Sequence, residues 1–219
     1  MMLFGRKKLT SLAKPLSLVD LRKRVKIVVI DDDENAFPTR ILQDEGYTIE
    51  HWPEVKSLDR LERGDFDIIV LDIAGVAGRF APDDGLGILD HLKRHNPAQI
   101  IVAFSGQSFD LSKQRFFDMA DDVLPKPVNA LKCKQILDQL IEAKFTVEHM
   151  WNSVVVIMRR ENVPQKAIDK LEQSIAKAIS KGDKPDYGAL VSASVEKADL
   201  AARIAGVVTK IVTLCGLSL

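Results

Sequence analysis

Short apolar runs alternate with amphipathic segments along the first two thirds of the chain. The apolar runs are expected to form strands at 25–30, 47–52, 67–71, 99–104 and 122–124. The segments between them place apolar residues at helical spacing, and we expect helices at 34–45, 55–63, 84–94 and 108–120. Strands that alternate with helices typically form a parallel sheet with helices on both faces. The pattern therefore predicts an α/β fold with a doubly wound, five-stranded parallel sheet.

The last third of the chain shows no strand pattern. From Ala130 onward, apolar residues recur at spacings of three, four or seven, and no glycine or proline occurs before Pro164. This pattern predicts one helix that continues well past the edge of the α/β region. Pro164 is expected to start a further helix, and residues 186–214 to form one long helix or a pair broken near Gly206. We expect an all-α hairpin or bundle.

The N-terminal segment is strongly basic, because residues 1–26 hold eight lysines and arginines and a single acid, Asp20. We expect a solvated tail followed by a short helix at 16–24. The local positive charge could instead contact an anionic surface or a partner, and the spaced leucines could pack on the body of the protein. The sequence thus divides into a basic extension at 1–24, an α/β domain at 25–143 and a helical region at 144–219.

Charge, cysteine content and hydropathy limit the classes of protein to which the chain can belong. The chain has 31 basic and 31 acidic residues, so its net charge gives no bias toward nucleic acid or membrane. Cys133 and Cys215 lie far apart and outside metal-ligand spacing, which fits a reducing cytosol. No run approaches the roughly 18 apolar residues that a membrane span needs, and the N-terminus lacks a secretory signal core. We expect a cytoplasmic protein without a membrane span.

Polar and charged side chains follow the expected strands at their carboxyl ends. Because these ends meet at one edge of a parallel sheet, the side chains should converge there. The residues concerned are Asp31, Asp32, Asp72, Ser105 and Lys126.

Clustered carboxylates repel each other, and a hard divalent cation relieves the repulsion. The sequence therefore predicts a magnesium site made of Asp31, Asp32, Asp72 and the backbone carbonyl of Ala74. The acids could instead begin a helix as capping residues, with Lys126 as a surface charge. That interpretation explains each residue singly but does not explain their convergence.

With these residues in this order, residues 25–143 closely resemble the receiver domain of bacterial two-component response regulators. The resemblance rests on the acid pair, the strand-end aspartate, the small hydroxyl residue and the Lys126–Pro127 dipeptide. It implies that Asp72 accepts a phosphoryl group from a histidine kinase or phosphotransfer protein, assisted by Ser105 and Lys126. It also implies a cis peptide bond before Pro127 and no enzymatic activity beyond self-catalysed phosphorylation and dephosphorylation.

Two features depart from the receiver pattern. Val123 stands where receivers usually carry Tyr or Phe, so we expect another element to transmit the change on phosphorylation. Residues 73–84 form a longer loop than most receivers have. Its Arg79 and Phe80 are expected beside the pocket, where they could screen the phosphoryl group or contact a partner. The alternative is a tolerated surface insertion.

The helical region is expected to provide the output of a phosphorylation switch. Its wide apolar faces and mixed charge favour a downstream protein target or a homodimer through the C-terminal helices. DNA binding is the alternative, but the basic residues after Phe145 are dispersed among acids and do not form a concentrated positive face. A less favoured alternative is that His149 is a phosphotransfer histidine.

Overall fold

The computed structural model describes residues 8–78, 80–96, 98–106 and 114–217, which form two compact units. One unit comprises residues 17–142, and the other combines residues 8–16 with residues 143–217. The residues before position 25 are therefore divided between the two units. Residue 143, where the sequence placed the end of the α/β domain, lies at the unit boundary.

Among the described residues, five parallel strands form one sheet with the order β2-β1-β3-β4-β5. In this sheet Val28 pairs with both Glu50 and Ile69, and Val70 pairs with Val102. The order is that of the doubly wound, flavodoxin-like fold, which confirms the expected fold class. The strands are β1 (Lys26–Ile30), β2 (Thr48–Trp52), β3 (Ile68–Asp72), β4 (Ile100–Ser105) and β5 (Asp122–Pro125).

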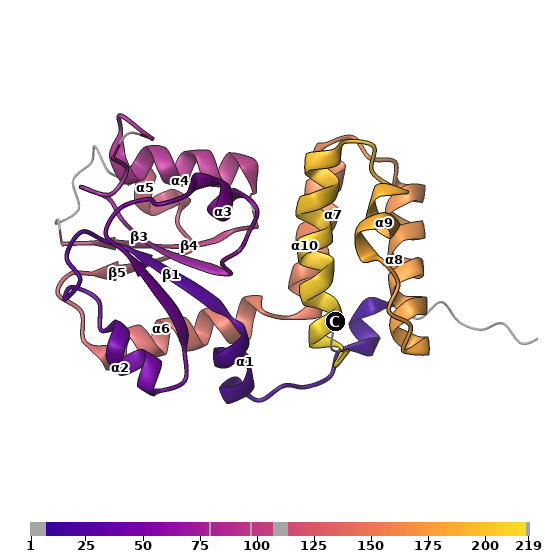
Figure 1. Ribbon diagram of the computed structural model, residues 1–219, viewed down its shortest axis with the longest axis horizontal. Helices are drawn as coiled ribbons and strands as arrows, with labels where there is room; N and C mark the ends of the chain where they lie inside the picture. Colours follow the sequence, from indigo (N-terminus) through magenta and orange to yellow (C-terminus); the bar gives the residue numbers. More distant parts are fainter. Residues whose placement is uncertain (1–7, 79, 97, 107–113, 218–219) are drawn as a thin grey trace, which may run out of the picture. The chain divides into compact units, whose positions relative to one another are not determined.

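Helices cover both faces of this sheet (Figure 1). One face carries α3 (Leu58–Glu62), α4 (Asp84–His95) and α5 (Gln114–Met119). The other carries α2 (Thr39–Asp44) and α6 (Ala130–Lys144), with α1 (Leu18–Arg24) held to α6 by an ion pair between Arg22 and Asp138. Side chains of β1, β3 and β4 pack against α3, α4 and α5 in a continuous buried core. The central strands are therefore buried on both faces of the sheet, as their uniformly apolar sequences require.

Several helices are shorter than the apolar pattern indicated, and local chemistry explains two of them. The helix expected at 34–45 begins only at Thr39, because a residue before a proline such as Pro38 avoids helical geometry. The helix expected at 55–63 begins at Leu58, because the Ser57 hydroxyl accepts a hydrogen bond from the Arg60 amide and caps it. The N-terminal half of the helix expected at 108–120 lies largely outside the described residues.

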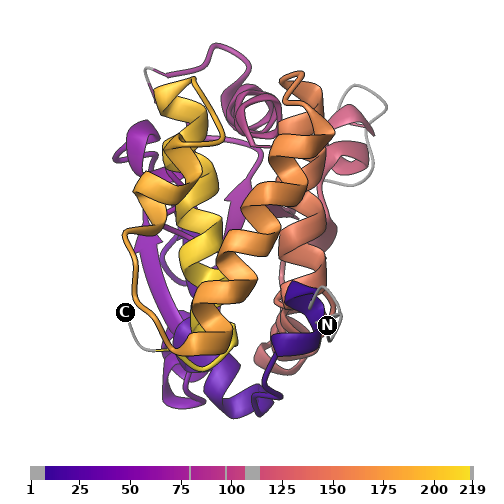
Figure 2. The same ribbon diagram turned by 90° about the vertical axis from the view of Figure 1, so that its right-hand side faces the viewer.

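The second unit is helical (Figure 2). The 3-10 helix η1 packs on α7 and α8, and its Leu9 is fully buried. The alternative that an N-terminal leucine packs on the body is thus confirmed for Leu9. The remaining helices bury one apolar face each, as the spacing predicted. The elements are η1 (Leu9–Leu12), α7 (Val147–Arg160), α8 (Gln165–Lys181), α9 (Tyr187–Ser192) and α10 (Ala198–Leu214).

Two expected helix boundaries in this region are wrong. The continuous helix from Ala130 to Pro164 is interrupted, because α6 ends at Lys144 and α7 begins at Val147. Thr146 has extended backbone geometry, and its hydroxyl accepts a hydrogen bond from the His149 amide, so it caps a new helix. The later helices separate at residues 193–197, whereas Gly206 lies inside α10. No helix in the described part of the chain is long and apolar enough to cross a membrane.

Candidate functional site

Three charged side chains meet at the carboxyl ends of β1, β3 and β5. Asp31 follows β1, Asp72 is the last residue of β3, and Lys126 follows β5. The Lys126 Nζ lies 2.6 Å from Asp31 Oδ2 and 2.7 Å from Asp72 Oδ2. The sheet order reverses between β1 and β3, which is where ligands bind in doubly wound sheets. One ammonium therefore bridges two carboxylates at the switch point of the sheet.

Backbone groups hold both carboxylates in place. Asp31 is fully buried; its amide donates to the Trp52 carbonyl at 3.0 Å, and its Oδ1 accepts from the Asp33 amide at 2.9 Å. Asp72 is 6% exposed, and its Oδ1 accepts from the Ile73 amide at 2.7 Å. Each acid therefore directs its Oδ2 atom toward Lys126. Among the described residues, Asp31 Oδ2 has no hydrogen-bond partner beyond this ion pair.

Lys126 is positioned by its neighbours on β4 and β5. The Lys126–Pro127 peptide bond is cis, as the sequence predicted. The Lys126 amide donates to the Ser105 carbonyl at 2.9 Å, and its Nζ lies 4.7 Å from the centroid of the Phe104 ring. Such a contact between an ammonium and an aromatic face is attractive. Ser105, buried at the end of β4, therefore lies at the same edge as the charged residues.

Asp32 completes the acid cluster. Carboxylate oxygens of Asp31, Asp32 and Asp72 lie within 4.8 Å of one another. Asp32 is exposed, and the loop after β3 passes close to it, since a Cβ atom on Gly75 would lie 3.0 Å from Asp32 Oδ2. Ala74 precedes that glycine and is exposed. The structure therefore places the Ala74 residue in the segment beside the acids, and the ligand role of its carbonyl stays a prediction.

The loop after β3 is held by Asp84, for which the sequence predicted only the start of a helix. Asp84 Oδ1 accepts hydrogen bonds from the Val76 amide at 3.0 Å and the Ala77 amide at 2.8 Å, and its Oδ2 accepts from the Gly75 amide. One carboxylate thus binds three successive amides and folds the loop back toward α4. A local signal existed, because Asp and Asn side chains commonly bind nearby amides in turns.

Helix α4 begins directly against the strand that carries Asp72. The Gly85 amide donates to the Ile73 carbonyl at 3.1 Å, and a Cβ atom on Gly85 would lie 2.1 Å from the Asp72 carbonyl oxygen. Any larger residue at position 85 would push the helix away. The start of α4 is therefore mechanically linked to the backbone of Asp72.

Burial and neighbouring charges have opposite effects on the pKa values of Asp72 and Lys126. Burial raises the pKa of Asp72 above its usual value, and Asp31 adds to this effect, whereas Lys126 and the Ile73 amide oppose it. Burial alone would lower the pKa of Lys126, but Asp31 and Asp72 raise it above its usual value. The lysine therefore stays protonated, and the Asp72 carboxylate is less stable in the folded protein than in the unfolded chain.

Replacing Asp72 by asparagine is therefore expected to stabilise the metal-free fold at neutral pH. The raised pKa means that folded Asp72 binds a proton more tightly than the unfolded chain does, so its ionised form costs stability above that pKa. This cost fades as the pH falls below the usual aspartate range, and the two proteins should then converge. Urea unfolding of both proteins in a chelating buffer from neutral to acidic pH measures this difference. A variant that is less stable than the native chain at neutral pH would contradict the expectation.

The remaining residues singled out in the sequence have diverse surroundings. Phe80 lines a surface hollow together with Glu54, Val55, Lys56 and Gly78, whereas Arg79 lies outside the described residues.

Val123 is partly buried and packs against the core between the sheet, α4 and α5. His149 lies in the first turn of α7 and is partly buried. Cys133 and Cys215 are free and buried.

Solved structures similar to this chain include receiver domains. A CheY-like response regulator receiver domain protein from Methanospirillum hungatei JF-1 is 20% identical, with a TM-score of 0.46 over 54% of this chain and 94% of the other. The receiver domain of NtrX from Brucella abortus is 24% identical, with a TM-score of 0.45 over 53% and 98%. The beryllofluoride-activated NtrC4 receiver domain, solved as a dimer, is 20% identical, with a TM-score of 0.46 over 54% and 97%. No protein-family model and no curated protein matches the chain.

Proposed function

We propose that the chain is a response regulator that accepts a phosphoryl group on Asp72 from the phosphohistidine of a histidine kinase or phosphotransfer protein. The observation that carries this proposal is the bridge from Lys126 Nζ to Asp31 and Asp72, at 2.6 and 2.7 Å, at the switch point of the sheet. The residues that converge there are those on which the sequence resemblance to receiver domains depends. We further propose that it acts in the cytoplasm, in line with its free cysteines.

In the proposed reaction an Asp72 oxygen attacks the phosphorus atom of the donor. An O–P bond forms, the N–P bond to the donor imidazole breaks, and the imidazole nitrogen keeps the electron pair and takes up a proton. Phosphoryl transfer depends mainly on positioning and on neutralising negative charge. Lys126 neutralises charge by moving its ammonium from the Asp72 oxygen to a phosphoryl oxygen, and the Ser105 hydroxyl donates to a second one. The chain catalyses only its own phosphorylation and dephosphorylation.

The acid cluster fits a magnesium ion. The cluster offers oxygen ligands alone, as magnesium prefers. Asp31, Asp32 and Asp72 would hold the ion, with the Ala74 carbonyl as a further ligand. When bound, magnesium supplies positive charge that offsets the charge of the carboxylates and the phosphoryl group.

Labelling of the full chain tests this proposal. Incubation with acetyl phosphate and magnesium should add one phosphoryl group to the intact mass, and peptide mapping should place it on Asp72. Because acyl phosphates hydrolyse in alkali, the label should also be lost at high pH. Absence of labelling with acetyl phosphate and with a panel of histidine kinases would refute the proposal, as would a label on another residue.

We propose that phosphorylation changes self-association of the chain through the 130–160 segment. We also propose that the phosphorylated chain acts on a downstream protein target. Leu131 on α6 is 66% exposed and Val156 on α7 is 56% exposed, so both apolar side chains are accessible to a partner. Adding beryllofluoride and magnesium, which mimic the phosphoryl group, is expected to raise the mass measured by light scattering. The Val156→Glu variant should lose this increase, because a charge would be buried in the contact. An equal mass with and without the mimic would argue against this route.

A further inference from the structure

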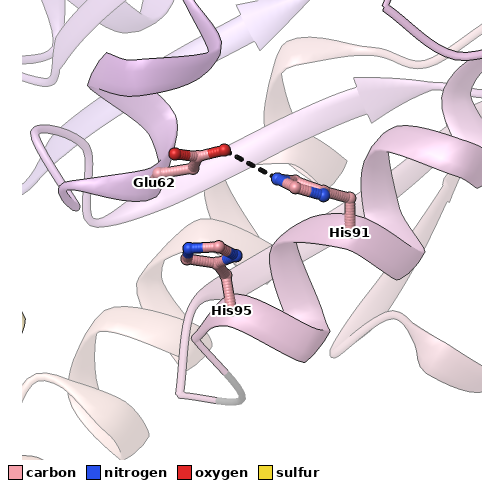
Figure 3. A group of neighbouring side chains, drawn as sticks. All are labelled: Glu62, His91 and His95. Carbon is pink, nitrogen blue, oxygen red and sulfur yellow. Dashed lines mark hydrogen bonds and ion pairs between the residues drawn. The ribbon is translucent and has the colours of Figure 1, made fainter. Parts of the chain in front are cut away.

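A second cluster of metal-ligating side chains lies between α3 and α4, and the proposed phosphoacceptor site does not use it. It consists of Glu62, His91 and His95, and Figure 3 shows the three side chains converging. One ligand atom from each lies within 4.8 Å of the other two. Glu62 Oε1 lies 2.7 Å from His91 Nε2, and the two imidazole rings lie 5.1 Å apart with an angle of 31° between their planes.

The two helices hold these side chains on a well-packed base. Glu62 is the last residue of α3, and the two histidines are four residues apart on the final turns of α4, so they share one face of that helix. The intervening residue Leu92 and the neighbouring Leu61 are each 1% exposed. The ligands are therefore presented by helical segments whose neighbouring leucines are buried, and helices position a metal site better than loops do. His95 is exposed, so an ion can enter from solvent.

Two imidazoles and one carboxylate are the ligand set of a borderline transition metal. Zinc binds histidine nitrogen at about 2.0–2.1 Å and carboxylate oxygen at about 2.0–2.2 Å. Neighbouring ligand atoms in a tetrahedral site are then about 3.4 Å apart, which small side-chain rotations reach from the observed arrangement. Magnesium, by contrast, prefers oxygen ligands and keeps its waters. The two clusters of the domain therefore differ in the metal that they favour.

We propose that Glu62, His91 and His95 form a binding site for zinc or a similar transition-metal ion on the α3–α4 surface. The three side chains occupy three ligand positions, and water or a partner's side chain takes the fourth. The site shares no residue with the acid cluster at Asp31, Asp32 and Asp72. It is therefore independent of the proposed phosphoryl transfer.

Calorimetric titration of the full chain with zinc chloride tests this site. Saturating magnesium is present so that the acid cluster does not capture zinc. The native chain is expected to bind one equivalent of zinc. His95→Ala, His91→Ala and Glu62→Gln should each weaken zinc binding at least about tenfold. Loss of a residue that only orients a metal ligand already lowers metal affinity by about 10-fold to 100-fold, and loss of the ligand itself should lower it at least as much.

Two controls separate this site from other zinc ligands. His149→Ala removes one of the two remaining histidines and should leave the affinity unchanged. Asp72→Asn should also bind zinc normally, whatever its effect on phosphoryl labelling. His95 is exposed, so His95→Ala should remain folded and stays informative if His91→Ala does not. The proposal is overturned if the native chain binds no zinc under these conditions, if His95→Ala binds it as tightly as the native chain, or if His149→Ala loses it.

Discussion

Replacing Asp72 by asparagine is expected to abolish phosphoryl labelling by acetyl phosphate while leaving the fold intact. Asparagine keeps the size and the carbonyl oxygen that accepts the Ile73 amide, but it has no anionic oxygen to attack phosphorus. Removing a covalent nucleophile lowers the rate by at least about a thousandfold. Intact mass spectrometry over a time course measures the loss, and circular dichroism checks the fold.

Asp59→Asn is a matched control for this experiment. Asp59 lies on α3 and its side chain is 70% exposed, so the same chemical change occurs at the surface, at a residue that is not part of the acid cluster. This variant should be labelled at the native rate. Labelling that persists in Asp72→Asn would move the acceptor elsewhere, and equal losses in both variants would point to a general effect of charge.

The doubly wound sheet followed from the sequence because its strands are buried on both sides. Residues 68–72 and 100–105 are uniformly buried, so their apolar runs carried a strong signal. The short helices carried a weaker one. The starts of α2 and α3 depend on Pro38 and on the Ser57 cap. Such local chemistry begins a helix later than the apolar spacing alone indicates.

The break between α6 and α7 shows the same competition. The apolar spacing continues through Phe145, which is 7% exposed, so periodicity alone gave one long helix. The Thr146 hydroxyl nevertheless caps a new helix at the His149 amide. A threonine three residues before a helical amide is a recognisable start signal, and at this boundary it prevails over the apolar spacing.

Convergence at the sheet edge could be predicted, but its finer contacts could not. The order of the strands brings Asp31, Asp72 and Lys126 to one edge whatever the details of the loops. The contacts of Asp84 with the loop amides and of Phe104 with the lysine depend on side-chain directions. Strand order does not determine those directions, so these residues were missed.

Replacing Lys126 by methionine is expected to destabilise the metal-free fold by about 3 kcal/mol, because it leaves buried carboxylates without their cation. Asp31 is fully buried and Asp72 is 6% exposed, so water replaces little of the lost interaction. Methionine keeps the length and apolar part of the side chain, which confines the change to the charge. Urea unfolding in a chelating buffer measures the loss, which should shrink at acidic pH as the carboxyl groups take up protons.

Magnesium should restore much of this stability, because an ion bound by the acids replaces the missing ammonium and favours the folded state. The gain on adding magnesium should therefore be larger in Lys126→Met than in the native chain. Lys134→Met is the matched control, since Lys134 pairs with Glu45 at the surface and its loss should change stability little, with or without magnesium. If both variants lose the same stability, or if magnesium stabilises both equally, Lys126 does not neutralise a buried pair of acids, and the charge arrangement proposed for phosphoryl transfer loses its basis.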